Sequence, residues 1–545
     1  MRIETGSKKI IFLISLFIGA LYLFMLSSDL GDFGGDNAQY IFLAKSLATG
    51  RGYRAINLPG SPVHSQYPPV FPLLLAPIIY FFGNNLFLMH LLIIACAIAS
   101  VYLIYKVIKD DDSEENALLV MIYAGLSPFL IISLLRILSE MPYFLFSLLT
   151  LFFIKKYADT NSVKNRYLFL SCLFMVITYF TRTVGISLFI AAIVYLIFGN
   201  GAVSLKIKLN KTFYVGIIFI IPFLLWNLRS LLIDKATPSY YNSFFLIDVY
   251  NPGIGYARLY DLLTRVNQNL IFYQDVIAGN IFYSGIYRTP ISLLILSIFI
   301  FGFLFKFLTK RTLLEFYLLV YLFIILLWPY TERRFLLPVL FLIIYYFLVG
   351  LKEFLNLFSK IQLVKLNRIL FSLVIIILAW SNFVISGKII KVHLSKIYFP
   401  KGCDVYKDKR NFPCLNLSNY YEGINAYLNG FDDQSRLIIE VYYRYLTVSS
   451  WLKEGVSKDS IIACRKPTIT SLFSNHKAAC YPFVKSEQKI ISWLKGNNIN
   501  YIILDEFSTE TNKYLLPVII KNRKIFWLIK RMGGTLLLEV RQDVI

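Results

Sequence analysis

The hydrophobic run IIFLISLFIGALYLFMLSS (residues 10–28) is followed two residues later by GDFGGDNAQYIFLAKSLATGRGY (residues 31–53). The first stretch is apolar and has about the length that crosses a lipid bilayer as a helix. The second begins with glycines and two aspartates, which let the chain turn sharply as it leaves the bilayer. A short helix with Asp36 at its cap and Gly50 at its end is then predicted, with its apolar face along the membrane interface.

Apolar residues dominate the whole chain. Hydrophobic residues make up 57% of the 545 residues and charged residues only 16%, which is more apolar surface than a soluble protein hides. With the first run, the segments of nearly bilayer length predict about eleven transmembrane helices. We therefore expect a polytopic α-helical membrane protein. The further segments lie near residues 86–105, 116–135, 141–154, 167–181, 185–199, 212–232, 290–308, 312–330, 335–350 and 369–387.

Lysine and arginine collect in short alternate loops, which indicates an orientation in the membrane. If Lys8 and Lys9 are cytoplasmic, the two long loops at 28–85 and 233–289 lie outside, together with the C-terminus. We expect an uncleaved anchor at the first span and a multi-pass plasma (inner) membrane location, in contact with membrane lipids. The net charge of +23 then comes mainly from the basic loops that set the orientation in the membrane. No nucleic-acid partner is therefore expected.

The tail at 391–545 differs from the transmembrane domain at 1–390. It mixes short apolar runs, such as SRLIIEVYYRY (residues 435–445), with helix-like stretches. Strands alternating with helices predict a small extracytoplasmic α/β domain. Four cysteines in this tail are disulfide candidates in an oxidising compartment, with free thiols as the alternative. The close pairings Cys403 with Cys414 and Cys464 with Cys480 are one of three connectivities.

Charged residues at the outer ends of spans are candidates for function. Asp36 and Glu140 are two acids that suit a general base or a site for a divalent ion, Mg²⁺ or Mn²⁺. Arg182, Arg333 and Arg334 suit phosphate oxygens, which guanidinium groups bind in a bidentate manner. A plain helix cap is the alternative for Asp36, and contact with lipid headgroups is the alternative for the arginines.

Several of these motifs occur together and in order. Asp36 with Tyr40 and Ala44 is followed by SLATGRGY, YPPVFPLLLAPIIYFFG, LSEMPYFLF, TRTVGISLF and RRFLLPVL. In this order the chain resembles the GT-C superfamily over residues 10–390. More narrowly, it resembles bacterial relatives of the dolichyl-phosphate-mannose protein mannosyltransferases and of the lipid A aminoarabinose transferase.

The resemblance implies a glycosyltransferase that moves a hexose or pentose from a polyprenyl-phosphate carrier to a glycan, lipid or protein acceptor at the outer face. It implies that Asp36 is the essential carboxylate, that Glu140 is a second candidate, and that Arg333 and Arg334 hold the carrier phosphate. A direct displacement of this kind inverts the anomeric centre. Further candidates for binding the phosphate or sugar are Arg182, Tyr40, His64 and Tyr67.

Two departures from the family patterns matter. Tyr67 stands where the aminoarabinose transferases have lysine before the double proline, which argues against that substrate. Asn37 follows Asp36 where the mannosyltransferases have a second acid, which leaves metal dependence open. Other functional classes also remain: a transporter or lipid flippase, an enzyme of the O-antigen ligase or polymerase type, and a non-catalytic assembly or receptor subunit.

Overall fold

Each apolar run predicted to span the membrane is a helix or two consecutive helices. The computed structural model describes residues 2–199, 204–233, 240–249, 254–282, 290–357, 364–399, 415–428, 430 and 432–544. The runs correspond to α1 (Arg2–Leu23), α4 (Leu86–Asp111), α5 (Glu114–Gly125) with α6 (Pro128–Ser133), α7 (Glu140–Ala158), α8 (Arg166–Thr181), η1 (Thr183–Gly185) with α9 (Ile186–Phe198), α10 (Leu205–Ile233), α13 (Pro290–Thr309), α14 (Leu313–Leu327), η3 (Arg333–Val339) with α15 (Leu340–Leu357), and α16 (Val364–Leu394).

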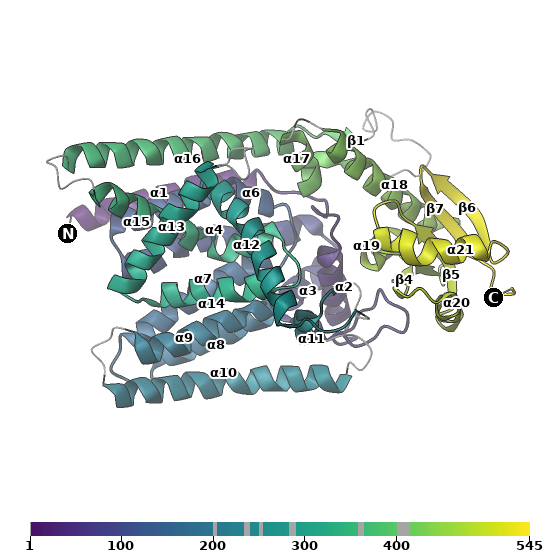
Figure 1. Ribbon diagram of the computed structural model, residues 1–545, viewed down its shortest axis with the longest axis horizontal. Helices are drawn as coiled ribbons and strands as arrows, with labels where there is room; N and C mark the ends of the chain where they lie inside the picture. Colours follow the sequence, from purple (N-terminus) through teal and green to yellow (C-terminus); the bar gives the residue numbers. More distant parts are fainter. Residues whose placement is uncertain are drawn as a thin grey trace.

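The prediction of a polytopic α-helical membrane protein is confirmed. In the described part of the chain, five segments are by length and composition able to cross a membrane: Leu86–Asp111, Leu205–Ile233, Pro290–Thr309, Arg333–Leu357 and Ile369–Leu394. Most of these helices run along the long axis of the molecule, and a small sheet domain lies at one end (Figure 1). At the centre, α15 is buried on every side from Leu340 to Leu351, as its uniformly apolar sequence requires.

Loops predicted to lie on the cytoplasmic side meet at one end of the bundle. Lys155 pairs with Asp111, and Lys306 Nζ lies 2.7 Å from Asp112 Oδ2. Lys155 is in the last turn of α7, whose first residue is Glu140. The predicted outer acid therefore lies at the opposite end of the same helix from these ion pairs.

The first long loop contains two helices, α2 (Asp36–Ala48) and α3 (Val70–Phe82). Helix α3 begins directly after Pro69, and proline is compatible with the start of a helix. The expectation that the apolar face of α2 contacts the membrane interface is wrong, because Tyr40, Leu43 and Ala44 on that face are buried within the protein. Helix α2 packs against α3 and against α19 (Pro467–Ser474) of the C-terminal domain.

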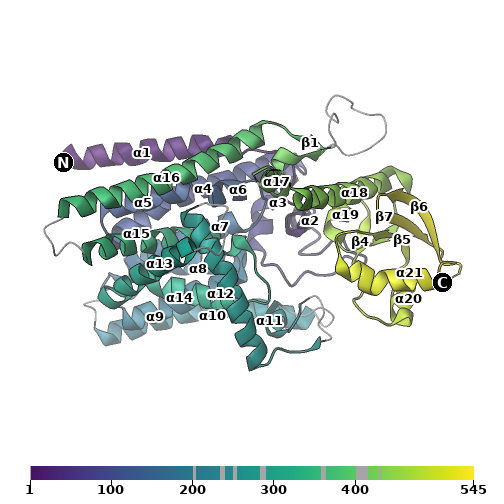
Figure 2. The ribbon, with the colours of Figure 1, turned by 45° about the horizontal axis from the view of Figure 1, so that its top comes forward.

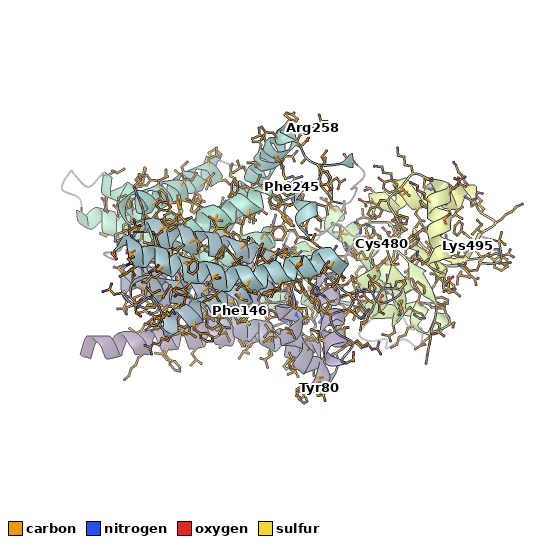
Figure 3. All side chains as sticks on the ribbon, turned by 90° about the horizontal axis from the view of Figure 1, so that it is seen from below. Tyr80, Phe146, Phe245, Arg258, Cys480 and Lys495 are labelled. Atoms are coloured by element: carbon orange, nitrogen blue, oxygen red, sulfur yellow. The ribbon has the colours of Figure 1, made fainter. Side chains whose placement is uncertain are left out.

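The second long loop contains α11 (Tyr240–Phe245) and α12 (Leu259–Ile281). Two polar side chains attach α12 to the core by donating to carbonyl groups that end α14. Arg265 donates to Leu327 O at 3.2 Å, and Asn269 donates to Trp328 O at 2.9 Å. These carbonyls lack partners within their own helix, so the bonds satisfy them. Figure 3 shows Arg258, just before α12, on the opposite flank from Tyr80 of α3.

The C-terminal domain is built around a five-stranded mixed sheet in the order β4-β3-β5-β7-β6. Strand β3 runs parallel to β4 and β5, whereas β7 is antiparallel to β5 and β6. The predicted small α/β domain is thus confirmed. Its elements are β1 (Tyr398–Phe399), β2 (Leu415–Asn416), η5 (Leu417–Asn419), α17 (Tyr421–Leu428), α18 (Asp433–Gly455), β3 (Ile461–Ala463), α19, β4 (Lys477–Ala479), α20 (Glu487–Gly496), β5 (Ile499–Leu504), η6 (Thr511–Leu515), α21 (Leu516–Lys521), β6 (Phe526–Met532) and β7 (Thr535–Val540).

One apolar run of this domain is a helix instead of a strand. The segment SRLIIEVYYRY belongs to α18, which begins after Asp432, whose carboxylate accepts from Ser435 N at 2.8 Å. Ile439, Tyr443 and Leu446 are buried at helical spacing along it. Helix α19 packs against α2, so the domain covers this part of the first long loop (Figure 2).

Candidate active site

The carboxylate of Asp36 is bound by two distant segments. Tyr67 OH donates to one of its oxygens at 2.9 Å, and Arg334 Nη2 donates to the other at 2.7 Å. Asp36 is the first helical residue of α2, and the cap position belongs to Gly35, whose φ of 103° suits a residue without a side chain. The interpretation of Asp36 as a plain helix cap is therefore wrong.

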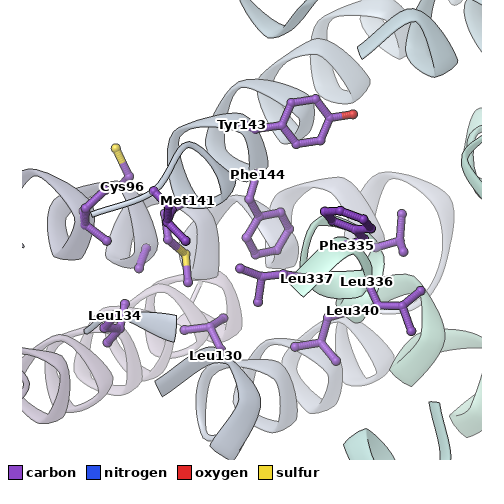
Figure 4. Packing of buried hydrophobic residues seen from close by; sticks show 14 of the residues in the cluster. Cys96, Leu130, Leu134, Met141, Tyr143, Phe144, Phe335, Leu336, Leu337 and Leu340 are labelled. Atoms are coloured by element: carbon purple, nitrogen blue, oxygen red, sulfur yellow. The ribbon is translucent and has the colours of Figure 1, made fainter. Parts of the chain in front are cut away.

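Arg334 comes from η3, which apolar residues hold in the bundle. Phe335 and Leu337 are buried next to Phe144 of α7 (Figure 4). Tyr321 OH donates to Phe335 O at 2.7 Å, which fixes the backbone immediately after the arginine. In the sequence RRFLLPV, the buried apolar residues thus set the position of the Arg334 guanidinium group.

Arg334 bridges the two acids that the sequence singled out. Its Nε lies 3.5 Å from Glu140 Oε1, while its Nη2 binds Asp36. It also pairs with Glu332. Its side chain is only 13% exposed, so these charges interact with little screening by water.

A second arginine, directly after the end of α8, completes the cluster. Arg182 Nη1 lies 2.6 Å from Glu140 Oε1 and donates to Ser139 Oγ at 3.1 Å. Ser139 Oγ is also 3.0 Å from Tyr40 OH. The structure therefore brings Asp36, Glu140, Arg182, Arg334, Tyr40 and Tyr67 into one network, as expected for parts of one site.

His64 supports this network indirectly. Its Nε2 accepts from Tyr67 N at 2.9 Å, and its ring stacks on the Tyr67 ring with centroids 5.4 Å apart. Its carbonyl accepts from Arg229 Nη2 at 3.1 Å. His64 thus orders the residue that donates to Asp36.

Arg333 takes a different direction from its neighbour. It is exposed and lines a small cavity together with Asp275, Asn280 and Tyr421. The expectation that Arg333 and Arg334 act as a pair on one phosphate is not met by this arrangement. In the 3₁₀ geometry of η3, successive residues point in different directions, so only one of the two arginines meets Asp36.

The electrostatic environment keeps Asp36 ionised. Burial by itself raises the pKa of a carboxyl group, but the charge of Arg334 and the hydrogen bonds from Arg334 and Tyr67 outweigh it. The net result is a pKa of Asp36 below its ordinary value. A weaker interaction with Arg334 would raise the pKa of this carboxylate.

Asp36 lines a cavity of about 1030 Å³ between the first long loop and the C-terminal domain. The loop contributes Asp36, Gln39, His64 and Tyr67, and the end of α10 contributes Leu232 and Ile233. The opposite wall belongs to the C-terminal domain and consists of Arg465, Lys466, Pro467, Thr468, Phe507, Ser508 and Glu510. The cavity is large enough for a ligand of several ring units.

The sequence analysis did not predict the residues of the opposite wall of the cavity. They follow the carboxyl ends of β3 and β5, which are parallel neighbours. Ligand sites of sheets with parallel strands lie at the edge where the carboxyl ends of the strands meet. The position of these residues directly after two strands is therefore the sequence feature that could have identified them. The two strands are recognisable in the sequence as the apolar runs DSIIACR and NYIILDE. The sequence does not show which edge of the sheet faces the first long loop, so it does not show that the residues after these strands belong to the site.

The two acids do not fit a divalent metal. Each carboxylate is paired with a guanidinium group, Asp36 with Arg334 and Glu140 with Arg182. Among the residues that the structure describes, no group of three or more histidine, cysteine, aspartate or glutamate side chains has the arrangement to hold a metal ion. The donor set expected for Mg²⁺ or Mn²⁺ is thus already neutralised, and no step is assigned to a metal.

The candidate pairing of Cys464 with Cys480, one of the three connectivities, is not present, and the alternative of free thiols holds for these two residues. Both are free thiols in the structure, and Cys464 Sγ donates to Thr470 Oγ1 at 3.3 Å. They follow the adjacent parallel strands β3 and β4, so they are close in space without being bonded. Cys403 and Cys414 lie outside the described residues.

Comparison with solved structures identifies the architecture. The chain is similar to ArnT from Cupriavidus metallidurans bound to undecaprenyl phosphate, with a TM-score of 0.54, 11% identity and 98% of each chain covered. The chain has the GT-C fold. It is also similar to the archaeal oligosaccharyltransferase AglB from Archaeoglobus fulgidus in complex with an inhibitory peptide and a dolichol-phosphate. That likeness has a TM-score of 0.54 and 12% identity, and covers 91% of this chain and 69% of the other.

Sequence comparison agrees with the GT-C fold. Residues 66–226 match the family model described as dolichyl-phosphate-mannose-protein mannosyltransferase. No curated protein matches the chain. The matched segment includes Tyr67, Glu140 and Arg182 of the site. The resemblance to the GT-C superfamily that the ordered motifs predicted is therefore confirmed.

Proposed function

We propose that the chain transfers a sugar from a polyprenyl-phosphate carrier to an acceptor at the outer face of the membrane. The observation that carries this proposal is the Arg334–Asp36 pair beside a cavity, in a protein with the GT-C fold. Support comes from the ligands named for two structures of this fold, undecaprenyl phosphate in ArnT and a dolichol-phosphate in AglB.

The arginines suit the carrier phosphate. Arg334 and Arg182 present guanidinium groups in a poorly hydrated site, where they balance the charge that grows on a departing phosphate. A phosphate that binds Arg334 competes with Asp36 for the same cation. Carrier binding therefore weakens the interaction that lowers the pKa of Asp36, and makes this carboxylate a better base.

Asp36 then serves as the general base. The acceptor oxygen forms a bond to the anomeric carbon while the bond from that carbon to the phosphate oxygen breaks, and the carrier phosphate leaves with the electron pair. The acceptor proton passes to Asp36. Attack opposite the leaving group inverts the anomeric centre, and Glu140 takes no covalent part because it holds Arg182 and Arg334 in place.

The same geometry supports a proposed location of the site in the cell. The site and the C-terminal domain lie at one end of the bundle, and the basic loops meet at the other. By the positive-inside rule we place the site and this domain on the extracytoplasmic side of the plasma (inner) membrane, with the N-terminus in the cytoplasm. The cavity takes a hexosyl or pentosyl donor and an acceptor that is a glycan, a lipid or a protein.

The direct test uses purified protein in nanodiscs with a panel of radiolabelled polyprenyl-phosphate sugars. We compare the wild type, Asp36→Asn and the matched control Asp112→Asn, which alters a carboxylate paired with Lys306 at the far end of the bundle. We expect transfer or slow donor hydrolysis in the wild type and the control, and its loss in Asp36→Asn. Equal transfer by all three proteins contradicts the role of Asp36.

A wild type that neither turns over nor binds any of these donors contradicts the reaction class. Binding of the lipid carrier is measured separately, as the shift in unfolding temperature of the protein on addition of undecaprenyl phosphate. In that case a transporter or flippase becomes the better explanation, and transport of the same lipids across proteoliposomes tests it.

A further inference from the structure

Phe33, three residues before Asp36, is held by the C-terminal domain. It is 2% exposed, and its ring stacks on Tyr420 and on Tyr442, with centroids 4.6 and 4.9 Å away. Stacked aromatic pairs contribute beyond the area that they bury. An apolar residue in the first long loop therefore has its main aromatic partners some 400 positions later, in α18 and immediately before α17.

The backbone on both sides of this ring is bound by the same domain. Phe33 O accepts from Lys466 Nζ at 2.8 Å, and Phe33 N donates to Glu422 Oε1 at 3.4 Å. Two residues earlier, Gly31 O accepts from Tyr421 N at 3.0 Å. The backbone N–H and C=O of Phe33 are thus both hydrogen-bonded by side chains of the C-terminal domain.

The ammonium of Lys466 is itself fixed. It donates to Tyr442 OH at 2.9 Å and lies 4.7 Å from the centroid of that ring and 5.3 Å from that of Phe507. Cation–π contacts of this kind hold a charge in one place. Lys466 also lines the cavity, so one side chain contacts both the loop and the space next to Asp36.

Only two glycines separate this anchor from Asp36. Glycine has the widest conformational range of all residues, so Gly34 and Gly35 do not by themselves fix the direction of the chain. The backbone at Gly35 passes close to α19, because an added Cβ would lie 2.9 Å from Thr468 Oγ1. The backbone that leads into Asp36 is thus held by the contacts of Phe33 and passes along the surface of the C-terminal domain.

We propose that the C-terminal domain positions the Asp36 carboxylate through Phe33, with Lys466 and Glu422 as positioning residues. The proposal rests on the proposed function, in which Asp36 is the base. It assigns this domain a part in the chemistry, because a base must lie within hydrogen-bond reach of the proton that it accepts. The arginines proposed to bind the carrier phosphate, Arg182 and Arg334, come from the helical core and not from the C-terminal domain.

The test replaces Lys466 with methionine, which keeps the length of the side chain and removes its charge. We measure deuterium uptake of the amides at 31–36, kcat of sugar transfer and affinity for undecaprenyl phosphate. We expect faster uptake in this segment alone, a fall in kcat of about 10- to 100-fold and no loss of affinity for the carrier. Lys466→Arg, which keeps the charge, restores most of the activity.

Two further variants make the result specific. Lys477→Met is the matched control, because Lys477 lies in the same domain and contacts the same loop at Ser61, away from Asp36. It is expected to behave as the wild type. Phe33→Leu keeps an apolar side chain but loses the stacking, and we expect it to repeat the effect of Lys466→Met.

Wild-type uptake and kcat in both Lys466→Met and Phe33→Leu overturn the proposal. A fall in carrier affinity together with faster uptake throughout the helical core also overturns it, because the effect is then general loss of structure. If uptake at 31–36 rises while transfer does not depend on Asp36, the proposed function fails and the anchor at Phe33 stands. The exchange measurement needs no activity, so the two failures are distinguishable.

Discussion

Arg334 donates to the Asp36 carboxylate at 2.7 Å across 298 positions of sequence. The pair joins the first long loop to the segment that precedes the central helix α15. It also places a cation where it can serve either the carboxylate or a phosphate. The catalytic proposal depends on this exchange of partners, and each part of it can be tested separately.

Replacing Arg334 with glutamine is expected to weaken binding of undecaprenyl phosphate about 10- to 100-fold, the value of one charge-assisted hydrogen bond or slightly more. Arg334→Lys keeps the charge but not the fork of donors, and is expected to recover only part of the affinity. Binding is measured by thermal shift in nanodiscs. Arg444→Gln is the control, since Arg444 pairs with Glu506 within the C-terminal domain. Unchanged affinity in Arg334→Gln contradicts the role of this residue.

Tyr67→Phe is expected to shift the pH dependence of transfer. The hydroxyl of Tyr67 donates to the ionised form of Asp36 and helps to lower its pKa, so its removal raises that pKa. The acidic limb of the kcat profile should therefore move to higher pH. Tyr80→Phe, which changes an exposed tyrosine of α3, should leave the profile in place. A limb that stays fixed or moves to lower pH speaks against Asp36 as the base.

Glu422 makes the stability of the domain contact dependent on pH. Burial, followed by the charge of Asp32, raises the pKa of Glu422 from 4.5 to about 7. Between these values the folded protein keeps a proton that the unfolded chain releases. The stabilising contribution is therefore complete below pH 4.5 and is lost as the pH rises through about 7. Unfolding temperatures from pH 4.5 to 8 should show a decline that Glu422→Gln flattens, and equal slopes in the two proteins contradict this assignment.

Chelation is expected to leave transfer unchanged. Arginines already neutralise both Asp36 and Glu140, so the reaction has charge compensation without a divalent ion. The rate in excess EDTA is compared with the rate in Mg²⁺ and in Mn²⁺. A loss of activity with EDTA that either ion restores contradicts the assignment of charge compensation to the arginines.

Local features of the fold were predictable from the sequence. Each apolar run of nearly bilayer length is helical, and α3 begins directly after Pro69. Length and composition suffice for such segments, because a chain in lipid must satisfy its backbone groups within the segment itself. The strands after Ser460 and Asn498 were likewise visible as short apolar runs.

Features that depend on the surroundings were not predictable. The run SRLIIEVYYRY has many β-branched and aromatic residues, but its burial within the domain and its cap at Asp432 make it helical. The helix α2 was expected at the membrane surface, and it is covered by a domain whose position no local pattern reveals. The free thiols of Cys464 and Cys480 follow from side-chain positions that spacing does not specify.

Some features of the candidate site were likewise predictable from the sequence, and others were not. The sequence by itself determined that Asp36 follows a membrane span and that acids and arginines gather at the ends of spans, because charge is costly in lipid and stays near its edges. The tertiary structure decided that Arg334 and not Arg333 meets Asp36, and that Lys466 and Glu422 hold the loop through Phe33. These contacts join residues hundreds of positions apart, and only the packing of the whole chain determines which side chains meet.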